Sequence, residues 1–232
     1  MGDRFSRTVR IIGEESFRKI QDSNIVVFGI GGVGSYIVEA LVRSGVKKIT
    51  IVDNDIVNKT NINRQLIALE STIGKYKVDV MKERILDINS KAEVLAVKML
   101  YLPNNSHEFP IDNYDYIIDA IDNVSAKLEL ICRAEKAHVK IISCMGTGNK
   151  IDPSMLRIAD IYNTAVCPLA RVMRHELKKR GIKKLKVLYS EEKPIKEIIE
   201  QEKRTPASIS FVPGTAGLMI AGEVIRDIIG LD

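Results

Sequence analysis

The stretch that decides the fold runs from Asn24 to Gln65 and reads NIVVFGIGGVGSYIVEALVRSGVKKITIVDNDIVNKTNINRQ. It begins with an apolar run and continues through three spaced glycines into an amphipathic segment. A second apolar run follows and ends in Asp53. This order predicts a strand, a glycine turn, a helix and a second strand that ends in an acid. It is the pattern of a nucleotide-binding βαβ unit.

Each of the three glycines has its own expected role. Gly29 allows the tight turn out of the strand, Gly31 lets the backbone approach a phosphate, and Gly34 lets the helix pack against the strand. Free N–H groups at the helix start favour an anion. Asp53, at the tip of the second strand, is placed to accept hydrogen bonds from a ribose hydroxyl. The alternative is a glycine turn that only packs a helix on a sheet.

The residues after Asp53 favour ATP over a dinucleotide. Asp55 is followed by Asn61, Arg64 and Gln65, and the planar fork of arginine suits phosphate oxygens. A dehydrogenase needs little at this place beyond the acid that binds the ribose. Lys77 follows at the start of an expected helix. A lysine there is usually a solvated charge, but its closeness to the Asn-Arg-Gln stretch makes it a candidate phosphate ligand.

Composition sets the class of protein. The chain has 232 residues, of which 45% are hydrophobic, and this is typical of one large globular domain. Its three cysteines form no CxxC pair. This indicates a reduced, cytoplasmic setting and argues against a disulfide framework. No apolar run approaches the roughly 20 residues of a membrane span. The net charge of +5 permits nucleic-acid binding but does not require it.

The rest of the chain alternates apolar runs with amphipathic segments. Helices are expected at 3–22, after Gly74, and at 125–137, 168–180 and 215–229. Strands are expected at 93–99, 114–123, 141–144, 156–161, 186–190 and 208–212. The charged segment 191–207 is expected to form a mobile loop or a short surface helix. The expected fold is α/β: a Rossmann-like, doubly wound, mostly parallel sheet with helices on both faces and a C-terminal strand and helix extension.

Asp122 and Asn123 lie at the carboxyl end of the expected strand at 114–123, where open α/β sheets bind ligands. One interpretation is that the pair caps the next helix. The other is that Asp122 coordinates Mg²⁺ on the phosphates of ATP.

Six short motifs resemble those of a known family. They are RFSR (4–7), GIGGVGS (29–35), the acid at Asp53, NINRQ (61–65), GKYK (74–77) and AIDN (120–123). The chain resembles the ThiF, MoeB and HesA type of adenylating enzyme, which is related to ubiquitin-activating enzymes. The motifs occur in the family's order and cover roughly the first 150 residues.

The resemblance implies a role for each matching position. Catalysis would fall to Arg7, Arg64, Lys77 and Asp122. The nucleotide would be bound by Gly29, Gly31, Gly34, Asp53, Asp55, Asn61, Arg64, Gln65, Lys77 and Asp122. ATP and Mg²⁺ are the implied cofactors. Arg7 resembles an arginine that reaches into the neighbouring subunit's site, and this implies a homodimer in which Arg7 acts in trans.

The second half of the chain departs from the thiamine and molybdopterin branches, whose two CxxC pairs bind zinc, so no zinc is expected. From GTGNKIDP (146–153) to SISFVPGTAGLMIAGEVI (208–225) it resembles the tRNA threonylcarbamoyladenosine dehydratase branch instead. That branch uses ATP to close the threonylcarbamoyl side chain of an anticodon-loop adenosine into a ring. The expected organisation is one adenylation domain over 1–232. Its nucleotide-binding part covers about 1–150, and its part facing substrate and tRNA covers about 151–232.

Two other functions remain open. The chain could activate a small ubiquitin-like sulfur-carrier protein, which would then be its partner. It could also be a non-catalytic nucleotide sensor or an NAD-binding module.

A basic segment in the second half agrees with a tRNA substrate. The residues that could follow a phosphate backbone are Arg171, Arg174, Lys178, Lys179, Arg180, Lys183 and Lys184. The alternative is a merely solvated helix face.

Cys167 lies before Pro168 at an expected helix start, where a thiol pKa can be lowered. Two roles therefore stay open for Cys167, a catalytic nucleophile or a structural residue near the substrate. Cys144, at the end of a strand, is expected in the core.

Overall fold

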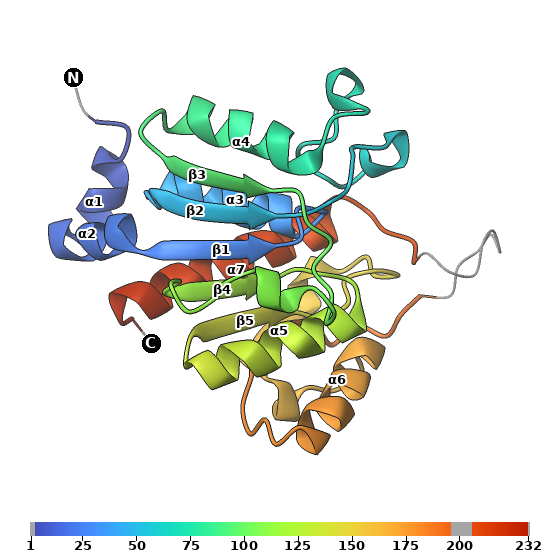
Figure 1. Cartoon of the computed structure of the whole chain (residues 1–232). Helices are drawn as coiled ribbons and strands as arrows, with labels where there is room; N and C mark the ends of the chain where they lie inside the picture. The colour runs from blue at the N-terminus through green and yellow to red at the C-terminus, as the bar shows by residue number, and fades with distance from the viewer. Residues whose placement is uncertain (1–2, 196–205, 232) are drawn as a thin grey trace.

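A sheet of seven strands forms the centre of the computed structural model, which describes residues 3–195 and 206–231 (Figure 1). The inner strands are short, mostly buried runs rich in Val and Ile, as expected of strands covered on both faces, whereas the two edge strands are more exposed. The strands are β1 (Asn24–Phe28), β2 (Lys48–Val52), β3 (Glu93–Val97), β4 (Tyr116–Asp119), β5 (Lys140–Cys144), β6 (Leu156–Asp160) and β7 (Lys186–Ser190). Their order is β3-β2-β1-β4-β5-β7-β6, and only the β6–β7 pairing is antiparallel. The expected doubly wound, mostly parallel sheet is confirmed.

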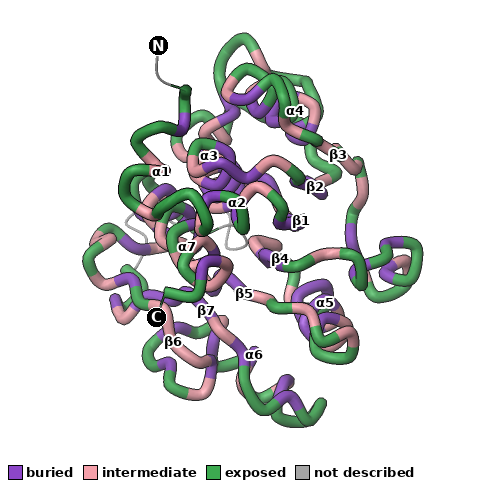
Figure 2. Tube along the Cα trace, turned by 90° about the vertical axis from the view of Figure 1, so that its left-hand side faces the viewer, coloured by how far each residue is buried: buried purple, intermediate pink, exposed green. Residues whose placement is uncertain are grey.

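Helices cover both faces of the sheet. The helices of the described residues are α1 (Ser6–Ile12), α2 (Glu14–Asp22), α3 (Gly34–Ser44), α4 (Lys77–Ile88), α5 (Val124–Ala137), α6 (Pro168–Lys179) and α7 (Phe211–Ile229), of which α1 and α2 lie at the amino ends of the strands (Figure 1). Alternate residues of β1 point to opposite faces. Val27 joins a core with α3, α4 and α7, whereas Val26 and Phe28 join a core with α5. Figure 2 shows buried residues concentrated on the central strands and on α3.

The order of the strands places a crevice at one edge of the sheet. Because β1 lies between β2 and β4, the winding of the chain reverses there, and ligands bind off the carboxyl ends of strands at such a point. Phe28 pairs with Val52 on one side and with Asp119 on the other. The segments that follow these three residues therefore emerge together at the carboxyl edge.

The prediction of a strand at 208–212 is wrong. Residues 206–209 form no strand, and α7 begins at Phe211 rather than at Thr215. The apolar stretch is buried as a helix because Gly214 and Gly217 let α7 approach α3 closely. Pro213 lies in the first turn of α7, where its missing N–H costs little. Most of the charged segment expected at 191–207 lies outside the described residues.

The other ends of the strands carry α1 and α2. Both helices precede β1 and lie beside its amino end (Figure 1). In the described parts of the chain, no helix is both long and apolar enough to cross a membrane.

Two glycines of α7 give a matched test of the α3–α7 contact. A Cβ on Gly217 would lie 2.5 Å from the Val33 carbonyl oxygen, whereas a Cβ on Gly222 would meet nothing within 4 Å. Gly217→Ala should lower the free energy of unfolding by about 1–3 kcal/mol or more, because the helices must separate. Gly222→Ala should raise it by about 0.5–1 kcal/mol through helix propensity. Urea unfolding measures both, and equal effects would contradict the packing.

Candidate functional site

The glycine turn between β1 and α3 is held against the end of β4. Gly29 has a φ of 88°, and a Cβ there would lie 2.6 Å from the Ala120 carbonyl oxygen. A Cβ on Gly34 would lie 1.7 Å from the Gly29 carbonyl oxygen. The fold therefore requires glycine at both positions, as the sequence predicts.

Gly31 differs from Gly29 and Gly34, because no close packing contact requires a glycine at this position. A Cβ at this position would meet only Gln65 Nε2, at 3.8 Å. Gln65 itself is 7% exposed, and its Oε1 has no hydrogen-bond partner among the described residues. The terminal amide can rotate to present either its oxygen or its nitrogen. The turn is thus bordered by open space and by a buried amide with an unused polar atom.

Asp53 connects the end of β2 to the glycine turn. Its Oδ2 accepts a hydrogen bond from the Ile30 N–H at 2.6 Å, and its Oδ1 accepts one from the Asp55 N–H at 2.8 Å. Burial raises the pKa of this carboxyl, and the positive charge of Lys77 partly offsets the effect. Each oxygen keeps a further lone pair that could accept from a ribose hydroxyl.

Lys77 is buried at the start of α4 with its charge directed to the same edge. It is 5% exposed, and its Nζ lies 2.7 Å from Asp55 Oδ2. The Lys77 N–H also donates to the Asp55 carbonyl oxygen. The side chain of Asp55 is itself exposed to solvent, so the Lys77 charge lies close to the surface at this edge.

Arg64 and Asn61 lie on the loop that follows β2. The Arg64 guanidinium donates to the Thr60 carbonyl oxygen at 3.0 Å and to Asn63 Oδ1 at 2.9 Å. Its Cγ would lie 3.4 Å from a Cβ on Gly32, so its stem borders the turn. Asn61 Oδ1 accepts from the backbone N–H of Asn58 and closes a capping box. Asn61 therefore shapes the loop that presents Arg64.

Asp122 is exposed on the loop after β4, and the capping interpretation does not apply to it. Asn123 provides the cap, since its Oδ1 accepts the Ala126 N–H at 3.0 Å. Among the described residues Asp122 has no hydrogen-bond or ion-pair partner. No group of three or more His, Cys, Asp or Glu side chains in that part of the chain could enclose a metal. A Mg²⁺ held mainly by phosphates and water needs only one or two carboxylates, and a free Asp122 fits that use.

Comparison with known proteins agrees with this geometry. The sequence model of the ThiF family matches residues 5–232. The chain belongs to the ThiF family. It is 44% identical to the tRNA threonylcarbamoyladenosine dehydratase of Bacillus subtilis, over 97% of this chain and 94% of that protein.

Two solved structures are also similar. They are crystal structures of E. coli tRNA N6-threonylcarbamoyladenosine dehydratase, TcdA, in complex with AMP and with ATP. Their TM-scores are 0.91 and 0.89 at 32% sequence identity. Each match covers 98% of this chain and 94% of the other.

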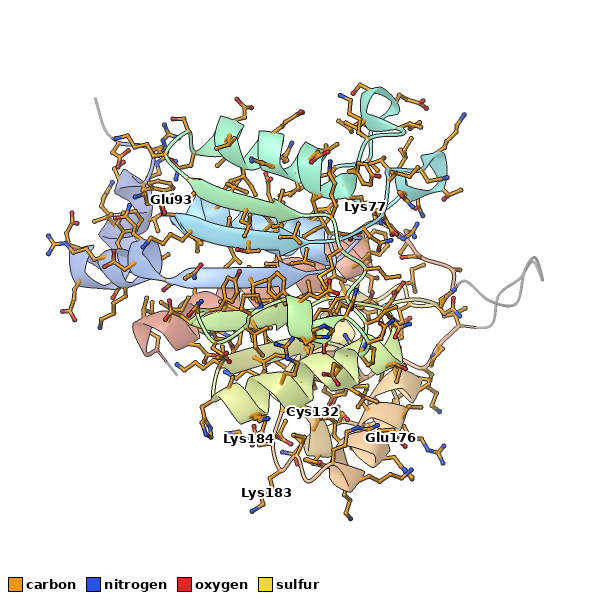
Figure 3. The ribbon with its side chains drawn as sticks, viewed as in Figure 1. Lys77, Glu93, Cys132, Glu176, Lys183 and Lys184 are labelled. Atoms are coloured by element: carbon orange, nitrogen blue, oxygen red, sulfur yellow. The ribbon has the colours of Figure 1, made fainter. Side chains whose placement is uncertain are left out.

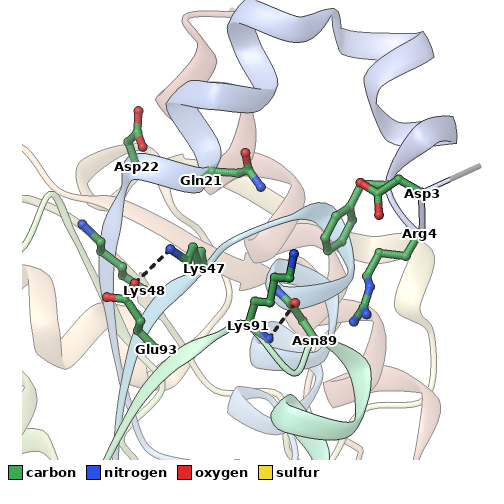
Figure 4. A pocket seen from close by; sticks show the side chains of 10 residues that line it. Asp3, Arg4, Gln21, Asp22, Lys47, Lys48, Asn89, Lys91 and Glu93 are labelled. Atoms are coloured by element: carbon green, nitrogen blue, oxygen red, sulfur yellow. Dashed lines mark hydrogen bonds and ion pairs between the residues drawn. The ribbon is translucent and has the colours of Figure 1, made fainter.

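Arg7 does not lie with the other site residues of this ThiF-family chain. It is exposed on α1, beside the amino ends of the strands, whereas the glycine turn lies at their carboxyl ends (Figure 1). A pocket at the amino end is lined by Arg4, Lys47, Lys91 and Glu93 among others (Figure 4). It contains none of the predicted site residues. Within one chain, Arg7 therefore cannot join the site.

Some basic side chains of the segment 171–184 have hydrogen-bond or ion-pair partners, and others have none among the described residues. Arg174 donates to the carbonyl and hydroxyl oxygens of Thr164, and Lys179 and Arg180 pair with Glu176. The exposed side chains without such pairing among the described residues are Arg171, Lys178, Lys183 and Lys184. Figure 3 shows Lys183 and Lys184 at the end of the molecule away from Lys77. The charge thus extends from α6 toward the amino side of the sheet.

Cys144 and Cys167 are buried, whereas Cys132 is partly exposed. Burial raises the pKa of Cys144 to about 12, so its thiol stays protonated at neutral pH, as expected of a core residue. Cys167 precedes α6 as expected, but it is 2% exposed and packs with Met145 and Ala170. This burial favours the structural role over the nucleophile.

The sequence interpretation missed a buried charge pair behind Asp122. Asp119, the last residue of β4, is fully buried and forms an ion pair with Lys127 of α5. The sequence did carry a signal, because Lys127 lies on the apolar stripe of α5 with Leu130, Ile131 and Ala134.

Two substitutions in the glycine turn separate packing from binding. Gly34→Ala should leave little folded protein, because its Cβ would overlap the Gly29 carbonyl oxygen. Gly31→Ala should keep the free energy of unfolding within about 0.5 kcal/mol of wild type. It should still weaken ATP binding by about tenfold or more, since the methyl group occupies the space of a phosphate. Thermal unfolding and ATP titration measure both effects. Unchanged ATP affinity in Gly31→Ala would exclude close phosphate approach there.

Proposed function

We propose that this ThiF-family protein is an ATP-dependent tRNA threonylcarbamoyladenosine dehydratase. The observation that carries the proposal is the 44% identity to a protein of that name over nearly the full length of both chains. The cluster of Asp53, Arg64, Gln65 and Lys77 around the glycine turn supplies matching chemistry. In the first step, the threonylcarbamoyl carboxylate attacks the α-phosphate of ATP. An acyl-adenylate forms, and pyrophosphate leaves.

The second step closes a ring. A nucleophilic atom within the threonylcarbamoyl group attacks the activated carbonyl and expels AMP, so the net change is the loss of one water. Adenylation converts a poor leaving group into a good one. The attack is intramolecular, and orientation supplies much of the rate. No thioester is needed, in agreement with the burial of Cys167.

The residues at the carboxyl edge of the sheet would have different roles in ATP binding and adenylation. Asp53 would accept from the ribose, and Asp55 would release Lys77 to the phosphates. Arg64 and Lys77 would offset the negative charge that builds on the α-phosphate during attack. Gln65 and Asn61 complete the predicted phosphate contacts. Asp122 would hold Mg²⁺, which adds positive charge at the phosphates when bound.

Arg7 completes the site only if a second subunit supplies it. Its place at the amino end of the sheet excludes a role in its own chain's site (Figure 1), while the family motif around it implies one. A homodimer in which Arg7 reaches the partner's phosphates would reconcile its position in this chain with the role that the motif implies. Because these arginines are exchanged symmetrically, each dimer would hold two sites.

The second half of the chain would face the tRNA. Within a single adenylation domain, residues 1–150 would hold the nucleotide, and residues 151–232 would contact the substrate. Arg171, Lys178, Lys183 and Lys184 are free for phosphate contacts, whereas Arg174, Lys179 and Arg180 would contribute to the surrounding potential. The three unpaired cysteines support a reducing, cytoplasmic setting.

Activation of a sulfur-carrier protein is the second candidate function. The ThiF-type nucleotide site would serve it equally well, because the activated group is again a carboxylate. Pyrophosphate exchange that depends on a carrier protein and is absent with tRNA would favour this function. A sulfur-transfer protein could also be a partner of the dehydratase itself.

Mass spectrometry of tRNA nucleosides tests the proposed function. Incubation of threonylcarbamoyladenosine-containing tRNA with the protein, ATP and Mg²⁺ should remove the mass of one water from the modified adenosine. Arg64→Ala should slow this by about 100-fold or more, because a charge on the α-phosphate loses its partner. Lys136→Ala, an exposed cation at the end of α5, serves as the control and should have no effect. An unchanged nucleoside mass would refute the proposal.

A mixing experiment tests Arg7 in trans. Arg7→Ala and Asp122→Ala dimers should each be nearly inactive. Random exchange of their subunits should restore about a quarter of wild-type activity, since half of the dimers are then mixed and each of these has one intact site. If both residues served the same chain's site, no mixed dimer would hold an intact site. Failure of two verified dimers to complement would therefore contradict the arrangement.

A further inference from the structure

The loop that carries Asp122 rests on a buried ion pair. Lys127 and Asp119 are both 0% exposed, and Lys127 Nζ lies 3.0 Å from Asp119 Oδ2. Asp119 Oδ2 also accepts from Ser143 Oγ on β5, at 2.6 Å. The pair thus joins α5, β4 and β5 directly behind the exposed loop.

Both charges also bind the peptide groups of Ile121. Asp119 Oδ1 accepts the Ile121 N–H at 3.1 Å, and Lys127 Nζ donates to the Ile121 carbonyl oxygen at 2.9 Å. That carbonyl belongs to the peptide bond leading into Asp122. Two opposite charges therefore fix the residue before Asp122 from both sides, and they leave its backbone little freedom to rotate.

Packing alone does not account for this arrangement. Burial of two charges is costly, and apolar side chains of similar size often serve a core as well or better. Lys127 occupies a position in α5 whose neighbours on the stripe are Leu130, Ile131 and Ala134. An apolar residue there would pack against β4 but could not donate to the Ile121 carbonyl.

We propose that Lys127 and Asp119 act as positioning residues that orient Asp122 toward the metal–nucleotide complex. The inference rests on the proposed role of Asp122. Both side chains are fully buried, so they would act on Asp122 rather than on the substrates. Asn123 fixes the other side of Asp122 by capping α5, so the Asp122 backbone is held between two anchored residues. Groups that hold a metal ligand from behind typically affect metal affinity or activity by 10–100-fold.

The double variant Asp119→Asn with Lys127→Met tests the proposal. It leaves no unpaired buried charge, and the amide introduced at position 119 can keep the bonds to the Ile121 N–H and to Ser143. Apart from the ion pair itself, only the donation to the Ile121 carbonyl is removed. We expect an unfolding midpoint near that of wild type and faster hydrogen exchange of the amides at 121–123. In ATP–pyrophosphate exchange, the Mg²⁺ concentration for half-maximal rate should rise by about tenfold or more.

A pair elsewhere in the fold provides the control. Lys186, the first residue of β7 and so at the amino end of the sheet, lies 2.6 Å from Asp227 Oδ1 and 2.7 Å from Glu223 Oε1. Asp227→Asn with Lys186→Met should alter stability without changing the Mg²⁺ requirement. If the double variant at 119 and 127 does not fold, Asp119→Asn with Lys127→Leu also lacks a donor for the Ile121 carbonyl and carries the same test.

The outcomes separate the inference from the proposed function. If Asp122→Ala keeps full activity, the role of Asp122 itself fails. If Asp122→Ala is inactive while the folded double variant has wild-type Mg²⁺ dependence and amide exchange, the pair is structural only and the positioning role is wrong. A raised Mg²⁺ requirement together with faster exchange at 121–123 supports it.

Discussion

The close approach of the Gly29 turn to the end of β4 is the constraint on which the rest of the site depends. Only glycine lets the β1 backbone turn within van der Waals range of the Ala120 carbonyl. This contact joins the two strands at which the winding of the sheet reverses. It places the phosphate turn beside the loop of Asp122, so a nucleotide between them would meet both. The chemistry of the site follows from that juxtaposition.

The charges around the turn are prepared before any substrate arrives. Asp53 is fixed by two backbone N–H groups, Lys77 by Asp55, and Asp122 by its anchored neighbours. Under the proposed function, Asp53 and Asp122 would need little reorganisation when charge develops on a phosphate, whereas Lys77 would exchange Asp55 for a phosphate oxygen. Arg7 is the exception. Its supply by a second chain would link catalysis to assembly of the dimer.

The sequence predicts best the residues whose surroundings are formed by nearby residues of the same chain. Gly29, Gly34 and Asp53 were foreseen because a strand, a turn and a helix determine their surroundings within about 25 residues. Contacts between distant segments were not. The burial of most of 212–217 as helix depends on α3, and an apolar run alone does not distinguish strand from helix. Likewise, the ion pair of Lys127 could not be predicted from the sequence around it, because it forms only when α5 packs against β4 and reaches Asp119. The distance of Arg7 from the turn also follows from the sheet, not from its motif.

Oxygen-isotope transfer tests the central claim most directly, namely that this edge of the sheet activates a tRNA-borne carboxylate by adenylation. The carboxylate oxygens of the threonylcarbamoyl group are labelled with ¹⁸O, and the tRNA is incubated with the protein and ATP. Attack on the α-phosphate followed by ring closure predicts one labelled oxygen in the AMP and none in the pyrophosphate. Unlabelled AMP, or label in pyrophosphate or orthophosphate, would contradict activation by adenylation.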